Sequence, residues 1–223
     1  TVMTASGTGS ATSINCTSTQ AGLLETVRDN YVTGLAFTGG TGTFTGIATG
    51  GVSSTSTRFV YNNTVTNCSG GTGFQSHGIN SGNITNQEIY NNLVSGITTG
   101  GNLNGLTFAS QGPGLSTVYN NTVYDITTTG NSAAIGISNA AAGTTYFYKN
   151  SVSKLRATNV GTTTTVRGID VTTGYKNYVY NNLVSDLNAT STTSIANAVM
   201  GINSTQNSPA NTIYLYNNTV YVN

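Results

Sequence analysis

A six-residue phrase recurs along the chain and constrains its fold more than any other feature. It reads VYNNTV, IYNNLV, VYNNTV, FYKNSV, VYNNLV and LYNNTV, around tyrosines at positions 61, 90, 119, 148, 180 and 216. Successive tyrosines are 29, 29, 29, 32 and 36 residues apart, and a degenerate copy, VRDNYV, precedes them at 27–32. This regular spacing identifies a repeat protein, in which each repeat stacks on its neighbours.

Each repeat predicts three strands. The recurring phrase contains two stretches of alternating apolar and polar residues, broken by an Asn-Asn pair that suits a corner with positive φ. Half a repeat away stands a glycine followed by an aliphatic residue, at Gly46, Gly78, Gly105, Gly136, Gly168 and Gly201. We therefore expect an all-β fold, a right-handed parallel β-helix with three parallel sheets and about seven coils of 29–36 residues.

Composition agrees with a thin, continuous core. Charged residues make up 6% of the chain, but its 36% hydrophobic residues fall at fixed repeat positions, which argues against disorder. No apolar run is long enough for a membrane span. A net charge of +1 without a basic patch argues against a nucleic-acid partner. We treat residues 1–223 as one β-helix domain, either a segment of a longer protein or an assembling subunit.

Aligned repeats divide into inward and outward columns. The apolar residue before each tyrosine, the valine of each phrase and the residue three places after that valine are expected to form three buried stacks. The valine column contains Val32, Val65, Val94, Val123, Val152, Val184 and Val220. The third stack contains Leu35, Cys68, Ile97, Ile126, Leu155 and Leu187. Burying such side chains supplies roughly 1.5–3 kcal/mol each, so no ion or cofactor is needed to explain the core, and no cofactor is expected.

The two asparagines of the phrase are not equivalent. The first place also accepts Asp29 and Lys149, which indicates that it faces solvent. The second place is invariant, and we expect it to form a buried asparagine ladder that satisfies backbone groups at the corner. The ladder comprises Asn30, Asn63, Asn92, Asn121, Asn150, Asn182 and Asn218.

These features resemble the right-handed parallel β-helix of the pectate-lyase-like superfamily. The YNNTV and Gly-Ile phrases are similar to the repeats of secreted and cell-surface β-helix proteins, many of them from bacteria of the Bacteroidetes group. The resemblance extends over about 14–222 and implies the fold. It does not imply one function, because the superfamily includes lyases, hydrolases, adhesins, phage spikes and passive stalks.

The carboxylates do not form a sequence motif for polysaccharide cleavage. Such enzymes use clustered aspartates, or acidic Ca²⁺ ligands with a basic residue. The available acids are Glu25, Asp29, Glu88, Asp125, Asp170 and Asp186, and no DD, DxD or acid-plus-His cluster occurs among them. Stacking of coils can still bring distant carboxylates together, so an enzyme stays the alternative interpretation.

Other chemically distinctive residues have structural explanations. Asp125, Lys154 and Asp186 occupy one place in successive repeats and are expected to form an exposed ion-pair ladder rather than a catalytic site. His77 is expected to be an ordinary surface or turn residue, with no metal site around it. Cys16 and Cys68 fall in different sheets and are expected to be free thiols.

The column that looks most functional is an outward strip of aromatic residues, which we call the tyrosine strip. It comprises Phe59, Tyr61, Tyr90, Tyr119, Tyr146, Tyr148, Tyr178, Tyr180, Tyr214 and Tyr216. Exposed aromatic surface of this length indicates a covered or binding surface. Three interpretations stay open: a self-stacking ladder that stiffens the sheet, a platform for a glycan, and a face that packs against a neighbouring chain.

The sequence favours an extracellular or cell-surface structural or adhesive β-solenoid module, such as a stalk, surface fibre or filament subunit, without catalysis of its own. Coil-like sequence extends to both ends, so we expect self-association or continuation of the β-helix there. The alternative is a carbohydrate-binding or carbohydrate-active β-helix that uses the tyrosine strip. Ice binding is a weaker third interpretation, because the Thr runs at 127–129 and 162–165 fall in expected turns.

Overall fold

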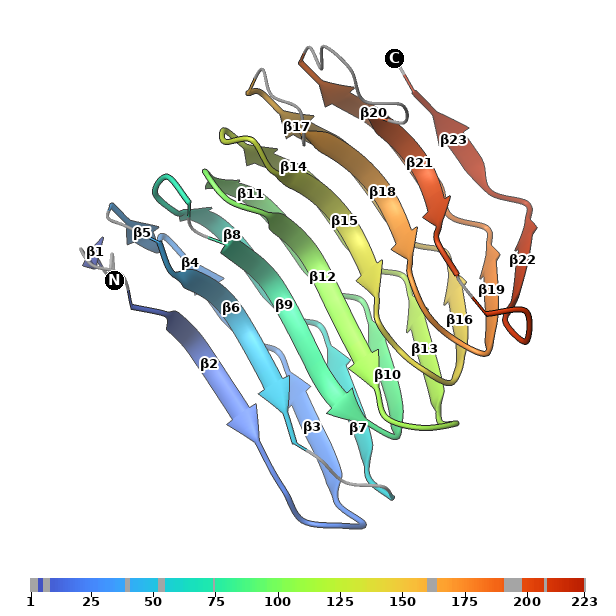
Figure 1. Cartoon of the computed structure of the whole chain (residues 1–223). Coiled ribbons are helices and arrows are strands. Elements are labelled where there is room, and N and C mark those ends of the chain that lie inside the picture. The colour runs from blue at the N-terminus through green and yellow to red at the C-terminus, as the bar shows by residue number, and fades with distance from the viewer. Residues whose placement is uncertain are drawn as a thin grey trace.

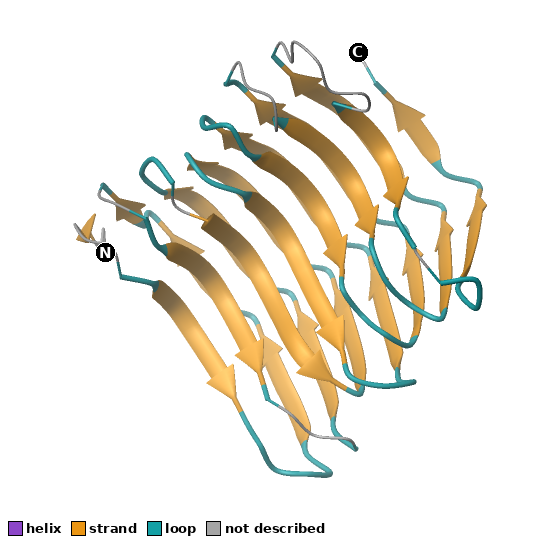
Figure 2. Cartoon of the chain, in the orientation of Figure 1, coloured by secondary structure: helices purple, strands orange, loops and turns teal. Residues whose placement is uncertain are grey.

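The computed structural model describes residues 4–5, 9–38, 41–51, 55–73, 75–159, 164–190, 198–206 and 208–222. Within these residues the chain forms 23 strands and no helix (Figures 1 and 2). All pairings between strands are parallel, and each strand pairs with the equivalent strand of the next coil. The protein is therefore a parallel β-solenoid.

Three sheets run along the solenoid. Sheet B contains β2 (Ala11–Thr17), β6 (Thr43–Gly50), β9 (Gln75–Ile84), β12 (Leu103–Ser110), β15 (Ala133–Asn139), β18 (Thr165–Val171) and β21 (Val199–Ser204). Sheet C contains β3 (Leu24–Arg28), β7 (Thr57–Tyr61), β10 (Asn86–Tyr90), β13 (Leu115–Tyr119), β16 (Thr144–Tyr148), β19 (Lys176–Tyr180) and β22 (Thr212–Tyr216). Sheet A contains β1 (Thr4–Ala5), β4 (Tyr31–Thr33), β5 (Ala36–Phe37), β8 (Thr64–Ser69), β11 (Leu93–Thr99), β14 (Thr122–Thr128), β17 (Ser151–Ala157), β20 (Leu183–Ala189) and β23 (Thr219–Tyr221).

The chain visits sheets B, C and A in that order and then begins the next coil. It makes about six turns, close to the seven coils expected, and its two ends lie at opposite ends of the stack (Figure 1). The longer repeats hold their extra residues between strands, since β14, β17 and β20 each have seven residues. Register is therefore kept along the whole stack, and the tyrosines of successive repeats are paired directly.

The three expected core stacks are buried over most of the solenoid. Val60, Val123 and Leu155, one from each stack, are at most 1% exposed. The last coil differs, because Leu215 and Val220 belong to the same stacks but are 53% and 45% exposed. The expectation that every member is buried is wrong for these two residues, since no described coil covers them.

The glycine of each Gly-Ile phrase faces the valine column. A Cβ at Gly105 would lie 2.3 Å from Val123 Cγ1 and 2.7 Å from the carbonyl oxygen of Gly136. The equivalent contact recurs between Gly78 and Val94, and between the other glycines and valines of these columns. Sheets A and B therefore approach each other so closely that only glycine fits opposite the valine.

Replacing Gly105 tests this close approach. We expect Gly105→Ala to lower the free energy of unfolding by about 1–3 kcal/mol or more, because the methyl group overpacks the core. Adding Val123→Ala should cost less in this background than in the original protein, since it removes one of the two clashes. Chemical denaturation of the single and double variants measures this coupling, and strictly additive effects would contradict the assigned contact.

The invariant asparagines form the expected ladder between sheets C and A. Each interior Asn Oδ1 accepts hydrogen bonds from the backbone N and the Nδ2 of the Asn one coil earlier. For Asn121 these bonds come from Asn92 at 3.1 and 2.9 Å, while Asn121 Nδ2 donates to Asn150 Oδ1 at 3.0 Å. Asn121 Nδ2 also donates to the carbonyl oxygen of Ile89 at 2.9 Å. The ladder runs from Asn30 to Asn218 without interruption.

The first asparagine place supplies the corner conformation. All its members have φ between 53° and 57° and are exposed, including Asp29 and Lys149. The left-handed conformation favours Asn, Asp and Gly, which explains why this place is mostly asparagine although its side chain is not buried. The two neighbouring asparagines therefore have different roles, one conformational and one in hydrogen bonding.

The two roles separate on mutation. Asn121→Ala should lower the free energy of unfolding by about 1–3 kcal/mol, because buried donors and acceptors lose their partners. Asn120→Gly is the matched control and should be nearly neutral, since glycine adopts positive φ without strain. Equal losses in denaturant melts would show that the wrong asparagine has been placed in the interior.

Candidate functional site

The tyrosine strip lies on the outer face of sheet C, as expected. It forms two parallel columns. The first column is continuous and contains Tyr61, Tyr90, Tyr119, Tyr148, Tyr180 and Tyr216. The second begins with Phe59, is interrupted by Glu88 and Thr117, and resumes with Tyr146, Tyr178 and Tyr214.

Neighbouring rings in both columns stack on one another. In the first column the ring centroids are 4.8–5.1 Å apart and the planes differ by 1–12°. In the second, Tyr146, Tyr178 and Tyr214 stack at 4.7 Å. These separations match the spacing of strands and exceed contact distance between ring planes, so the rings are offset. Self-stacking of the tyrosines is therefore confirmed, and it covers ring faces while hydroxyl edges remain outside.

Stacking changes the acidity of the phenols. Burial raises the pKa of Tyr90, Tyr119, Tyr148 and Tyr180 above the usual value of 10.0. Neighbouring phenols add to the increase in pKa for Tyr119 and Tyr180, and the Glu88 carboxylate adds to it for Tyr119 and Tyr148. Folding therefore favours the neutral phenol at these four tyrosines.

Glu88 is the one carboxylate on the outer face of sheet C among the described residues. All four arginines of the chain pair with other carboxylates: Arg28 with Asp29, Arg58 with Glu25, Arg156 with Asp186 and Arg167 with Asp170. Within the described ranges, Glu88 has neither a hydrogen bond nor an ion pair. Its carboxylate is available to a ligand.

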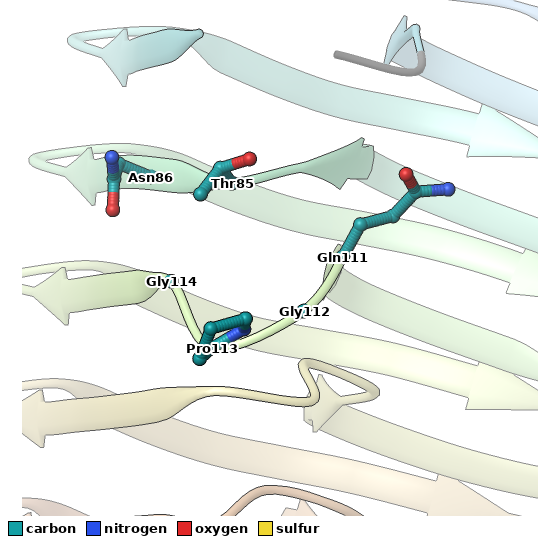
Figure 3. Close-up of a pocket in the computed structure, with 6 residues that line it drawn as sticks. All are labelled: Thr85, Asn86, Gln111, Gly112, Pro113 and Gly114. Atoms are coloured by element: carbon teal, nitrogen blue, oxygen red, sulfur yellow. The ribbon is translucent and has the colours of Figure 1, made fainter. Parts of the chain in front are cut away.

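Two hollows lie near Asn86, and the smaller one is also lined by Glu88. A small one, of ≈ 80 Å³, is lined by Thr57, Asn86, Gln87, Glu88, Leu115 and Thr117. A larger one, of ≈ 450 Å³, is lined by Thr85, Asn86, Gln111, Gly112, Pro113 and Gly114. Figure 3 shows Thr85 and Asn86 on one coil and the loop from Gln111 to Gly114 on the next. Because Asn86 lines both, the two hollows are neighbours at the corner between sheets B and C.

A buried ion pair inside the solenoid was missed by the sequence analysis. Arg58 Nε lies 2.6 Å from Glu25 Oε2, and the two side chains are 1% and 9% exposed. Arg58 Nη1 also donates to the carbonyl oxygen of Gly82 at 2.8 Å. Arg58 stands two residues before the buried Val60, so strand alternation alone places it inside. The position of Glu25 one coil earlier, directly paired with Arg58, supplied the second signal.

The expected ion-pair ladder is wrong. Within the described residues, no ion pair joins Lys154 to Asp125 or Asp186, and Asp186 pairs instead with Arg156 at 2.6 Å. Asp125, Lys154 and Asp186 have φ of 56°, 52° and 53°. The same place holds Gly34, Asn67 and Gly96, also at positive φ. The column is therefore a left-handed bend in sheet A, and the glycines in it were the signal for this.

The remaining acids, His77 and the cysteines form no joint site. Asp170 accepts bonds from Arg167 at 2.8 Å and from Asn203 at 2.6 Å on sheet B. His77 is half-buried in β9, where Nδ1 lies 3.3 Å from Thr107 Oγ1 and burial lowers the pKa of the imidazole. Both cysteines are free thiols, as expected, and burial raises the pKa of Cys68.

The described part of the chain contains no helix with the length and apolar character needed to cross a membrane. In the same ranges, no three His, Cys, Asp or Glu side chains gather into a group suited to a metal ion.

The threonines at 127–128 lie within β14 rather than in a turn, and the side chains of Thr128 and Thr164 are buried. Residues 162–163 lie outside the described residues.

Comparison with known proteins gave no matching family model, no matching curated protein and no matching solved structure. The parallel β-solenoid with three sheets stands on the structure itself. The finer resemblance, to the pectate-lyase-like superfamily and to Bacteroidetes cell-surface proteins, has no support from these comparisons.

The phenol pKa values predict a pH dependence. A pKa raised by folding contributes stability that is complete below the unfolded pKa near 10.0 and is lost as pH rises through the folded pKa. We therefore expect the free energy of unfolding to fall above pH 10, because Tyr90, Tyr119, Tyr148 and Tyr180 ionise at higher pH in the folded than in the unfolded protein. Denaturant melts across this pH range measure the loss of stability, and a free energy of unfolding that stays constant or rises above pH 10 would contradict the raised pKa values.

Proposed function

We propose that the chain is an extracellular or cell-surface structural β-solenoid module, a stalk, surface fibre or filament subunit, with an adhesive role and no catalysis of its own. The observation that carries the proposal is the continuity of its ladders. Hydrogen bonds of the asparagine ladder and stacked rings repeat from coil to coil in the same geometry. Such a rod lengthens by adding coils, and its mechanics do not depend on a particular site.

The end face formed by β21, β22 and β23 supports assembly. Leu215 and Val220 are exposed there beside a hollow of ≈ 480 Å³. Asn218 Oδ1 accepts bonds from Asn182, while Asn218 Nδ2 donates to the carbonyl oxygen of Val179 at 2.8 Å. Its backbone N–H and second amide hydrogen point along the ladder without a described acceptor. A further β-solenoid coil fits this face, because Asn30 at the other end has an Oδ1 that accepts no hydrogen bond from any described residue.

That further coil comes either from the same polypeptide or from a second subunit. In both cases we expect the native particle to be a rod longer than the described six turns, about 30 Å at the usual spacing of strands. Electron microscopy of native material measures this length. Isolated particles of only that height would contradict the assembly part of the proposal, and the denatured mass of the native polypeptide distinguishes the two sources.

Variants of the 223-residue chain test the end face directly. We expect concentration-dependent association in sedimentation experiments, and a monomer of 22.9 kDa after Leu215→Asp with Val220→Asp, because charges on an apolar face prevent stacking. Ser151→Asp with Ser153→Asp, on the outer face of sheet A, is the charge-matched control and should still associate. Association that survives the end-face variant, or that the control abolishes equally, would contradict the assignment.

A carbohydrate-binding role is the second candidate, and the uncompensated Glu88 within the tyrosine strip favours it. For cleavage, the two carboxylates without an arginine partner, Glu88 and Asp125, lie on different sheets, C and A. Incubation with neutral and uronate polysaccharides tests the proposed absence of catalysis. Release of reducing ends or unsaturated products, abolished by Glu88→Gln or Asp125→Asn, would overturn it.

A further inference from the structure

The second aromatic column contains a gap two residues long. Glu88, Thr117 and Tyr146 stand on successive strands in direct register. Tyr146 presents one ring face to Tyr178, at 4.7 Å and 6°. The opposite face of the Tyr146 ring is on the side of Thr117, and the threonine side chain has no ring to cover that face. The first column has no such break in these coils. In the second column, the gap leaves one ring face of Tyr146 uncovered on the side of the Glu88 carboxylate.

The gap has the width of one sugar ring. Two strand spacings separate Glu88 from Tyr146, which is about 9.6 Å. Subtracting the van der Waals half-thickness of the phenol ring and of the carboxylate leaves roughly 6 Å. A chair-shaped pyranose is a slab of similar thickness. Thr117 forms the floor of this slot and is short enough to leave it open.

The polar groups around the gap can bind the hydroxyl groups of a sugar. The Glu88 carboxylate has no described partner and can accept two hydrogen bonds. Asn86 Oδ1 is engaged by the backbone N of Leu115 at 3.0 Å, so its Nδ2 remains as a donor. Tyr119 and Tyr148 present hydroxyl edges beside the gap. The acceptor of Glu88 and the donor of Asn86 line the small hollow together with Thr117, and the apolar face of Tyr146 lies on the next strand in register with Thr117.

The larger hollow at the corner, which is lined by Asn86, Gln111 and Pro113, extends the site (Figure 3). It shares Asn86 with the hollow beside Glu88. A ligand longer than one sugar ring therefore has space to continue from the gap toward the loop at 111–114. No described cation lies at Glu88, so an anionic sugar would meet an uncompensated charge.

We propose that Glu88, Thr117, Tyr146 and Asn86 form a binding subsite for one pyranose ring of a neutral glycan. The C–H face of the sugar packs on the free face of Tyr146, and its hydroxyls donate to Glu88. The subsite discriminates against uronates through the charge of Glu88. This inference concerns the adhesive part of the proposed function and is independent of the end face, so the two fail separately.

The test uses calorimetric titration of the folded 223-residue chain with cellohexaose, mannohexaose, xylohexaose and hexagalacturonate. We expect at least one neutral hexasaccharide to bind and hexagalacturonate to bind more weakly. Glu88→Gln should weaken binding of the neutral ligand about tenfold, because a hydrogen bond to a charged acceptor is lost. Thr117→Tyr should abolish binding by filling the gap with a ring that stacks on Tyr146, without loss of stability.

Asp125→Asn and Tyr124→Leu are the controls. Both lie in β14 on sheet A, away from the gap, and should leave affinity within about twofold. The inference is overturned if no neutral hexasaccharide binds, if Thr117→Tyr binds as tightly as the original protein, or if hexagalacturonate binds as tightly as the neutral ligands. Sedimentation of the same variants shows whether end-face association persists, which separates failure of this subsite from failure of the proposed module.

Discussion

Self-pairing of one buried amide underlies this structure. An asparagine side chain carries both a donor and an acceptor, so identical residues can bond to one another at every coil. In the ladder the Nδ2 to Oδ1 distances are 2.9–3.0 Å from Asn30 to Asn218. A slip of one residue would misalign the paired amides of the ladder and would turn core side chains to the outside. The ladder therefore fixes the register on which the other columns depend.

Register then brings the core and the outer face into alignment. Inside, glycine opposite valine allows sheets A and B to approach, as at Gly105 and Val123. Outside, tyrosines that share one place in the repeat stack on one another. The strip is thus largely occupied by its own rings, and away from the ends of the columns a ligand can reach a ring face where the repeat is broken, beside Glu88 and Thr117. The positions where the repeat is broken are therefore more informative about function than the regular columns.

Much of the fold could be predicted because equivalent positions of successive repeats have the same structural environment. The strands and the three core stacks follow from the alternation of apolar and polar residues. The ladder follows from the invariant second asparagine of each repeat. Arg58 was missed because an ion pair with Glu25 makes a charged residue tolerable at an inward place, and only the pairing of coils reveals it. The prediction of an ion-pair ladder at Asp125 was wrong because it considered only the charges in this column. The φ of 56° at Asp125 shows that the column is selected for a left-handed backbone conformation. Ring orientation, which decides what the strip can bind, follows from lateral contacts that no single repeat contains.

Hydrogen exchange of the asparagine side-chain amides, measured by NMR, tests the ladder most directly. The Nδ2 hydrogens of Asn92, Asn121 and Asn150 are each bonded to the next Asn and to a core carbonyl, so they should exchange only when the solenoid opens. We expect them to exchange at least about a hundredfold more slowly than those of the adjacent, exposed Asn91 and Asn120. Equal exchange rates at the two places would contradict a buried, continuous asparagine ladder.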